Sequence, residues 1–181
     1  MKGIVFTEFI EFVENTFGFE VADAMISKAD LKSGGVYTAV GTYDFDEMVG
    51  LLIQLNKITQ MPVPQLLEAY GSHLFYRFVE LYPHFLTKEV GLFGFIEKID
   101  QYIHVEVKKL YPDAELPKIT VHRSTSHEME MVYKSSRKLS FFALGLLKSA
   151  SEFFEEPISI QMKDHSADGT ETLFILTKTN D

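Results

Sequence analysis

The sequence contains no cysteine and no tryptophan, and it carries fewer basic than acidic side chains. Without cysteine, a disulfide, a thiolate metal site and a cysteine nucleophile are all excluded. The 17 Lys and Arg residues against 26 Asp and Glu give a formal net charge of −9, which argues against nucleic acid or an anionic membrane as the main partner.

Long apolar runs are missing as well. No stretch approaches the ~18 uninterrupted apolar residues that a membrane span needs. Glu8 and Glu11 interrupt the apolar start of the chain, which therefore does not qualify as a signal peptide. We expect a cytoplasmic protein that does not enter a membrane.

The residues that are present describe an ordinary globular chain. Apolar residues make up 46% and charged residues 24% of the 181 positions, and this length fits one domain. The 16 Phe and 8 Tyr residues indicate a core or pocket rich in flat rings.

Apolar side chains recur every three or four residues along the first two thirds of the chain, which is the spacing of helices with one buried face. Asp44 followed by Glu47 predicts a capping box at the start of one of these helices. Proline predicts the start or the end of two others. The predicted helices cover residues 3–17, 19–29, 44–59, about 62–83 and 91–111.

After Pro117 the apolar period changes from 3.6 to 2, which indicates strands. Strands are expected to start at 119–121 and to cover 129–133, 157–162 and 172–178, with a helix over 139–154 inserted between the second and the third. The fold class is therefore α+β: a helical lobe of about residues 1–60, then a lobe of about 61–181 with an antiparallel sheet of about four strands and packed helices. Both lobes form one domain, 1–181.

One of the six histidines differs from the others. His104 lies at the edge of the apolar stripe of the 91–111 helix, and Asp100 stands one turn earlier, where it can orient the ring. The residues alone leave two interpretations open, a structural histidine or a ligand for a buried metal or haem. His73 is expected to be buried and satisfied; surface positions are expected for His84, His122, His127 and His165.

A second group of polar residues alternates along the chain. In an extended segment Tyr133, Ser135 and Arg137 project to one side and offer a phenol, a hydroxyl and a guanidinium. Such a set of donors suits one or two carboxylates, which Arg can bind through two hydrogen bonds. The alternative is the polar face of an edge strand that leads into the next helix.

Five stretches of the chain carry a family resemblance: Met1–Val5, Ile99–Val107, Pro117, Tyr133-x-Ser135-x-Arg137 and Leu144–Leu147. Together they resemble the H-NOX family, the haem nitric oxide/oxygen-binding domains that include the haem domain of soluble guanylate cyclase. The resemblance implies haem b between a distal lobe (1–60) and a proximal lobe (61–181). It also implies that His104 is the proximal iron ligand, that Tyr133, Ser135 and Arg137 hold the propionates, and that Pro117 presses on the porphyrin.

The resemblance also implies a gas-sensing mechanism in which a diatomic ligand binds opposite His104 and weakens the iron–histidine bond. Oxygen needs a distal hydrogen-bond donor, and nitric oxide does not. The position that matches the distal tyrosine of oxygen-binding relatives is Phe142, and the other expected distal residues, Val5, Phe9, Leu74 and Leu146, are apolar. We therefore expect binding of nitric oxide, and also of carbon monoxide, unless Tyr70 or His73 turns inward.

A stand-alone sensor of this length is expected not to be an enzyme and to act in trans. The resemblance implies a histidine kinase or a cyclic-dinucleotide enzyme as the partner. The zinc–cysteine site of some bacterial relatives cannot form here, so no zinc is expected. Three alternatives remain: an oxygen-binding haem sensor, a haem enzyme or gas carrier, and a haem-free module that binds an apolar ligand and uses Arg137 for a carboxylate.

Overall fold

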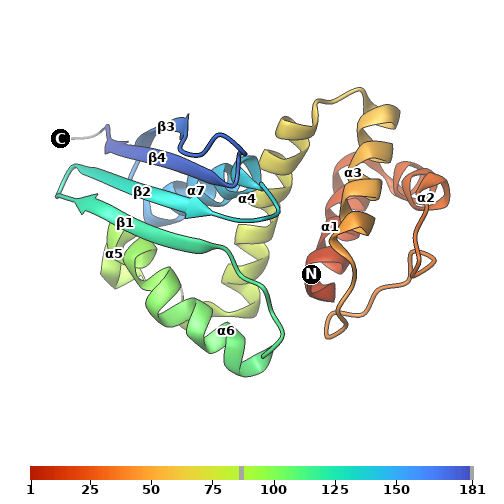
Figure 1. Ribbon diagram of the computed structural model, residues 1–181, viewed down its shortest axis with the longest axis horizontal. Helices are drawn as coiled ribbons and strands as arrows, with labels where there is room; N and C mark the ends of the chain where they lie inside the picture. Colours follow the sequence, from red (N-terminus) through yellow and green to blue (C-terminus); the bar gives the residue numbers. More distant parts are fainter. Residues whose placement is uncertain (86–87, 180–181) are drawn as a thin grey trace.

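Helices occupy the first two thirds of the chain and strands most of the last third (Figure 1). The computed structural model describes residues 1–85 and 88–179. The predicted α+β class is confirmed. The helices are α1 (Gly3–Phe17), α2 (Phe19–Lys28), α3 (Phe45–Thr59), α4 (Val63–Leu81), α5 (Gly91–Lys98), α6 (His104–Leu110) and α7 (Ser140–Phe154), with short 3-10 turns η1 (Pro83–Phe85) and η2 (Lys88–Val90).

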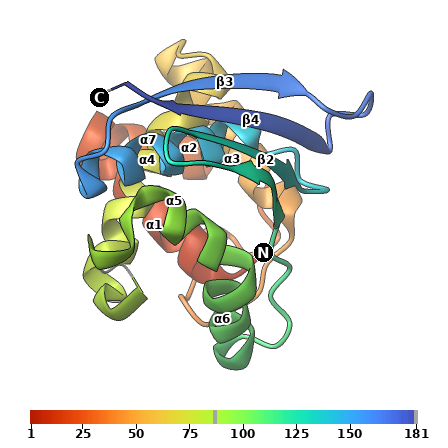
Figure 2. The ribbon, with the colours of Figure 1, turned by 90° about the vertical axis from the view of Figure 1, so that its left-hand side faces the viewer.

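The strands form one antiparallel sheet in the order β1-β2-β4-β3. Their bounds are β1 (Lys118–Ser124), β2 (Glu128–Lys134), β3 (Ile158–Asp164) and β4 (Glu171–Lys178). Met129, Met131 and Tyr133 alternate along β2 and are all buried, because one face of the sheet packs against α4, α5 and α7. Figure 2 shows α5 below the strands.

Two hydrophobic cores share α4. The N-terminal core joins α1, α2 and α3 to the first half of α4, where Leu66, Tyr70 and Leu74 are buried. The C-terminal core joins Phe75 of the same helix to α5, α7 and the sheet. The lobe boundary near residue 60 stays a prediction, and α4 connects both cores. In the described residues, no helix has the length and apolar character to cross a membrane.

The helices α4 and α7 touch through glycine. A Cβ atom on Gly71 would lie 2.2 Å from the carbonyl oxygen of Phe142, and one on Gly145 would lie 2.0 Å from that of Glu68. Both distances are impossible for real atoms, so only glycine allows the two backbones to approach this closely. This contact positions Phe142 beside the N-terminal core.

The predicted capping box at the start of α3 is wrong. Asp44 is the N-cap residue but makes no capping hydrogen bond with its side chain, and its carboxylate pairs with Lys32 at 2.6 Å. The buried carboxylate of Glu47 instead accepts hydrogen bonds from the Ser33 hydroxyl and, at 2.8 Å, from Tyr37. The loop before α3 folds over the start of that helix, and its hydroxyl donors satisfy Glu47 in place of the backbone.

The helix predicted over 91–111 is also not continuous. A π-helical turn, η3 (Ile99–Ile103), separates α5 from α6. A π turn holds one more residue than an α turn would; such turns are rare and are frequently found at functional sites. The apolar spacing hides this turn, because its residues continue to recur every three or four positions.

Candidate functional site

A cavity of about 330 Å³ is lined by residues of both cores. This volume falls in the range of small-molecule and cofactor sites, and most of the lining side chains are apolar. Nine of the ten site residues predicted from the sequence line it: Val5, Leu74, His104, Pro117, Tyr133, Ser135, Arg137, Phe142 and Leu146. The tenth, Phe9, is fully buried in the N-terminal core, with its ring centroid 5.0 Å from that of Tyr70.

Five residues form what we call the apolar wall of the cavity: Val5, Tyr70, Leu74, Phe142 and Leu146. The Tyr70 hydroxyl donates a hydrogen bond to the backbone carbonyl of Val5 at 2.6 Å. Burial raises the pKa of this phenol well above its ordinary value, so it keeps its proton. A phenol has one proton to donate, and this one is already donated to Val5. The wall therefore offers a cavity ligand no free hydroxyl from these five residues.

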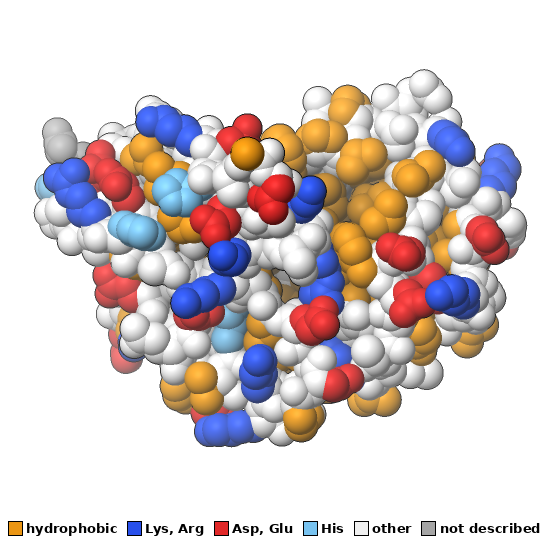
Figure 3. All heavy atoms as spheres, in the orientation of Figure 1, with side chains coloured by type: hydrophobic (Ala, Val, Ile, Leu, Met, Phe, Trp, Pro, Cys, Tyr) orange, Lys and Arg blue, Asp and Glu red, His pale blue; other side chains and the backbone are white. Residues whose placement is uncertain are grey.

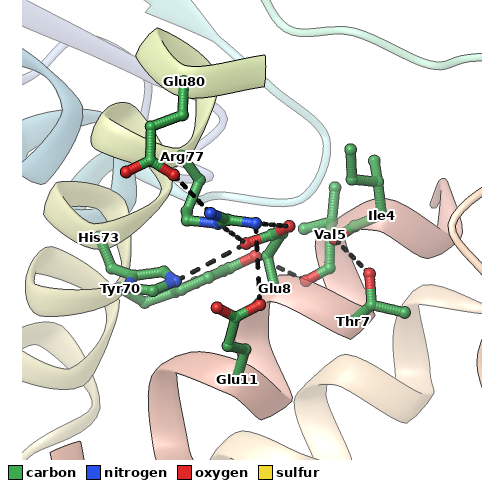
Figure 4. A network of polar contacts seen from close by, with 9 residues as sticks. All are labelled: Ile4, Val5, Thr7, Glu8, Glu11, Tyr70, His73, Arg77 and Glu80. Carbon is green, nitrogen blue, oxygen red and sulfur yellow. Dashed lines mark hydrogen bonds and ion pairs between the residues drawn. The ribbon is translucent and has the colours of Figure 1, made fainter. Parts of the chain in front are cut away.

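A polar network behind this wall ties α1 to α4 (Figure 4). Arg77 on α4 donates to Glu8 on α1 at 2.7 Å and also contacts Glu11 and Glu80. Glu8 is buried, so its charge needs this partner. The pair holds α1 against α4, and α1 carries the Val5 carbonyl to which Tyr70 donates.

His73 belongs to this network and not to the cavity lining. Its Nε2 atom lies 3.8 Å from Glu8 and has no hydrogen-bond partner, so the expectation of a satisfied buried histidine is wrong. Desolvation lowers the pKa of His73, against the opposing effect of Glu8 and Glu11. The ring stays neutral at pH 7 and packs near Phe12, with the ring centroids 5.6 Å apart.

His104 projects from the other side of the fold, at the first position after the π turn. Its Nδ1 atom lies 2.9 Å from the Asp100 carboxylate, which confirms that Asp100 orients the ring. A carboxylate at Nδ1 favours the tautomer with the proton on that atom and leaves the Nε2 lone pair for a metal. His104 also lines the cavity.

The residues around His104 are weakly packed. We call residues 99–117 the histidine segment; no residue of η3 or α6 within it is buried. Its far end is tied to the start of the chain. There Lys2 bonds to Thr42 at 2.8 Å and to Asp113 at 3.2 Å, and lies over the Tyr111 ring.

Tyr133, Ser135 and Arg137 also line the cavity. The expected extended geometry holds only as far as Lys134, where β2 ends; the chain then turns, with the Lys138 N–H bonded to the Ser135 carbonyl at 3.1 Å. Burial raises the pKa of Tyr133, against the opposing effect of Ser135 and Arg137, so its hydroxyl remains a donor. Ser135 accepts a hydrogen bond from the backbone N–H of Arg137 at 3.2 Å. The Arg137 guanidinium lies mostly inside the protein, over the ring of Phe45.

The comparisons with known proteins decide the family. A family model described as haem-NO-binding matches residues 2–162, most of the chain. The chain belongs to the H-NOX family. Domains of this family bind haem and act as gas-sensor modules, which confirms the resemblance inferred from the motifs. No curated protein matches the sequence.

Three solved H-NOX structures illustrate the similarity. The protein from K. algicida in the unliganded Fe(II) state is 41% identical, with a TM-score of 0.95 and coverage of 100% of this chain and 98% of that chain. The IWP-051-bound H-NOX from Shewanella woodyi in the Fe(II)CO state is 37% identical, with a TM-score of 0.83 and coverage of 99% and 95%. The S. oneidensis protein in the Fe(II)NO state is 26% identical, with a TM-score of 0.87 and coverage of 99% and 100%.

The residues of this H-NOX chain fit a haem. The cavity presents apolar side chains to a flat macrocycle, an imidazole with Nδ1 already bonded, and a guanidinium, a phenol and a hydroxyl for carboxylates. Each of these features corresponds to one part of the haem group. His104 would hold the iron, and Tyr133, Ser135 and Arg137 would hold the propionates.

Proposed function

We propose that this chain is a nitric oxide sensor that binds haem b through His104 and signals to a separate enzyme. Bound haem would supply a ferrous iron that takes nitric oxide or carbon monoxide, and His104 would be the protein ligand of that iron. The observation that carries the choice of gas is the hydrogen bond from Tyr70 to Val5 at 2.6 Å. It removes the one hydroxyl of the apolar wall from the donors available to oxygen.

Phe142 supports the same choice. It lies on the apolar wall, its ring centroid is 5.3 Å from that of Tyr70, and it has no hydrogen-bonding group. A distal donor stabilises the partial negative charge on bound oxygen, and nitric oxide does not depend on one. A wall built from these two side chains favours nitric oxide over oxygen.

The response of the protein follows from how His104 is held. Loss of its bond to the iron would leave Asp100 as the partner that keeps the ring in place. The histidine segment could then shift against the better-packed helices, and the surface seen by a partner would change. A partner responds only to the extent that it binds the two arrangements differently.

We propose a histidine kinase or a cyclic-dinucleotide enzyme as this partner, with no catalytic step on the chain itself. The formal net charge of −9 suits a basic surface on the partner. On the face in Figure 3, acidic and basic side chains are interspersed, and apolar side chains gather near α3, where Val49 and Ile53 are exposed. Autophosphorylation of a candidate kinase that changes only with the nitrosyl protein would identify the partner.

The test of gas choice is the absorption spectrum of the anaerobic ferrous protein, before and after nitric oxide and, separately, after air. We expect a five-coordinate ferrous spectrum, a five-coordinate nitrosyl spectrum and no lasting oxygen complex. A stable oxygen complex would overturn the choice of gas. A protein purified with ample haem that shows no Soret band would overturn haem binding altogether.

Two variants make this test specific to the apolar wall. Phe142→Tyr adds a hydroxyl next to Tyr70 and should produce measurable oxygen affinity. Tyr70→Phe removes a hydroxyl whose proton is already bonded to the Val5 carbonyl, so it should leave gas choice unchanged. Oxygen binding that appears in the wild type and disappears in Tyr70→Phe would show that Tyr70 is a distal donor after all.

A further inference from the structure

The guanidinium of Arg137 is already engaged by one residue of the histidine segment. Its Nη1 atom donates to the backbone carbonyl of Glu115 at 2.7 Å, and its Nη2 atom donates to the Glu115 carboxylate at 2.6 Å. Glu115 lies two positions before Pro117, and both residues line the cavity. Arg137 thus binds a carboxylate that belongs to the chain itself.

The two partners of this ion pair differ in freedom. The Arg137 side chain is 14% exposed and the Glu115 side chain 78% exposed. Arg137 is held on one side by the backbone carbonyl of Glu115 and lies over the ring of Phe45, 5.8 Å from its centroid. Glu115 can turn into water at little cost, because an ion pair with one partner in solvent is weak. Glu115 is therefore the partner that can leave the ion pair while Arg137 stays in place.

A haem propionate is chemically the same group as the Glu115 side chain. If a propionate binds Arg137, as the proposed function requires, it meets a guanidinium whose Nη2 atom already donates to the Glu115 carboxylate. Two carboxylates bound to the same Nη2 atom would repel each other, so the propionate and Glu115 do not bind there together easily. The backbone carbonyl on Nη1 is neutral and can remain bound while the carboxylates exchange.

We propose that Glu115 competes with the haem propionate for Arg137 and thereby weakens haem binding. This inference rests on the proposed function, because it assumes that Arg137 holds a propionate. Glu115 is an affinity-setting residue: it lowers haem affinity and speeds haem loss. The backbone contact from Arg137 keeps the loop before Pro117 in place whichever carboxylate is bound.

The test is Glu115→Gln in the full chain, which removes the charge and keeps the shape. We expect the variant to lose haem to an excess of a haem-free globin roughly two- to fivefold more slowly than the wild type, because the competing ion pair is a partly exposed one. The matched control is Glu155→Gln, which makes the same change of charge at the end of α7, where Glu155 pairs with Lys88 and is as exposed as Glu115. The control should lose haem at the wild-type rate.

A double-variant cycle separates competition from a general effect of charge. Arg137→Ala alone should lose haem faster than the wild type. The double variant Arg137→Ala with Glu115→Gln should lose haem at the same rate as Arg137→Ala alone. Thermal melts of all variants check that they fold. Equal haem loss in Glu115→Gln and the wild type, or equal slowing in Glu155→Gln, would overturn the competition. A wild type that takes up no haem would instead overturn the proposed function.

Discussion

The apolar wall and the histidine segment line the same cavity and are held in opposite ways. The wall is backed by α1 and α4, where an ion pair between buried Glu8 and partly exposed Arg77, together with a phenol-to-carbonyl hydrogen bond, joins two packed helices. The helical part of the histidine segment contains no buried residue and includes a π turn. Regions with few buried contacts open at lower free energy than packed cores. From this difference we expect the histidine segment to move on gas binding and the apolar wall to stay in place.

The largest expected effect is on the histidine segment itself. His104→Gly should remove the protein ligand from the iron and reduce haem affinity by roughly tenfold or more, since even the loss of an orienting partner costs 10–100-fold. Added imidazole should restore a histidine-like spectrum by entering the space left by the side chain. His165→Gly, at an exposed position, is the control. An unchanged iron–histidine stretching band in His104→Gly would mean that another residue is the ligand.

A smaller effect is expected where the wall depends on close packing. Gly71→Ala places a methyl group 2.2 Å from the carbonyl oxygen of Phe142, so α4 and α7 must separate. Overpacking of this kind costs about 1–3 kcal/mol, and calorimetry should show a lower melting temperature. Gly50→Ala is the control, since its new Cβ meets nothing within 4 Å and should stabilise α3 by roughly 0.5–1 kcal/mol. Equal melting temperatures for the two variants would contradict the close contact.

The smallest effect concerns pH. The pKa of His73 is lowered from 6.5, mainly by burial, so the folded chain resists its protonation while the unfolded chain does not. His73 therefore costs no stability above pH 6.5 and lowers stability progressively as the pH falls below that value. The loss should stay below about 1 kcal/mol, because the ring is partly exposed and Glu8 and Glu11 oppose the shift.

Urea unfolding at pH 7 and pH 5 measures this loss. His73→Gln should reduce the drop in unfolding free energy between the two pH values, and His127→Gln, at an exposed turn, should leave it as in the wild type. A drop of the same size in all three proteins would show that His73 titrates as it does in water.

Much of the fold could be predicted because periodicity reports burial. The strand pattern of Met129, Met131 and Tyr133 and the helical pattern of α1 and α4 each present one apolar face to a core. Capping could not be predicted at Asp44, because the loop before α3 folds back and supplies Ser33 and Tyr37 to Glu47, 14 and 10 positions later. Local propensity does not contain such contacts.

The candidate site shows the same division. The sequence pointed to Asp100 beside His104, since residues four apart on a helix are neighbours. It did not point to Glu115, which reaches Arg137 across 22 positions, nor to the bond from Tyr70 to Val5, which spans 65. Phe9 is one of the apolar distal residues expected from the family resemblance, but it lies in the N-terminal core, where Tyr70 packs against its ring.

The π turn of residues 99–103 sets the direction in which the His104 ring points. An α-helix advances about 100° per residue, so the extra residue of a π turn rotates everything after it by that amount relative to a regular helix. If the same residues wound as a regular α-helix with none removed, the His104 ring would point about 100° away from its direction in the structure. The direction of the imidazole therefore depends on the π turn before it as much as on the identity of the residues.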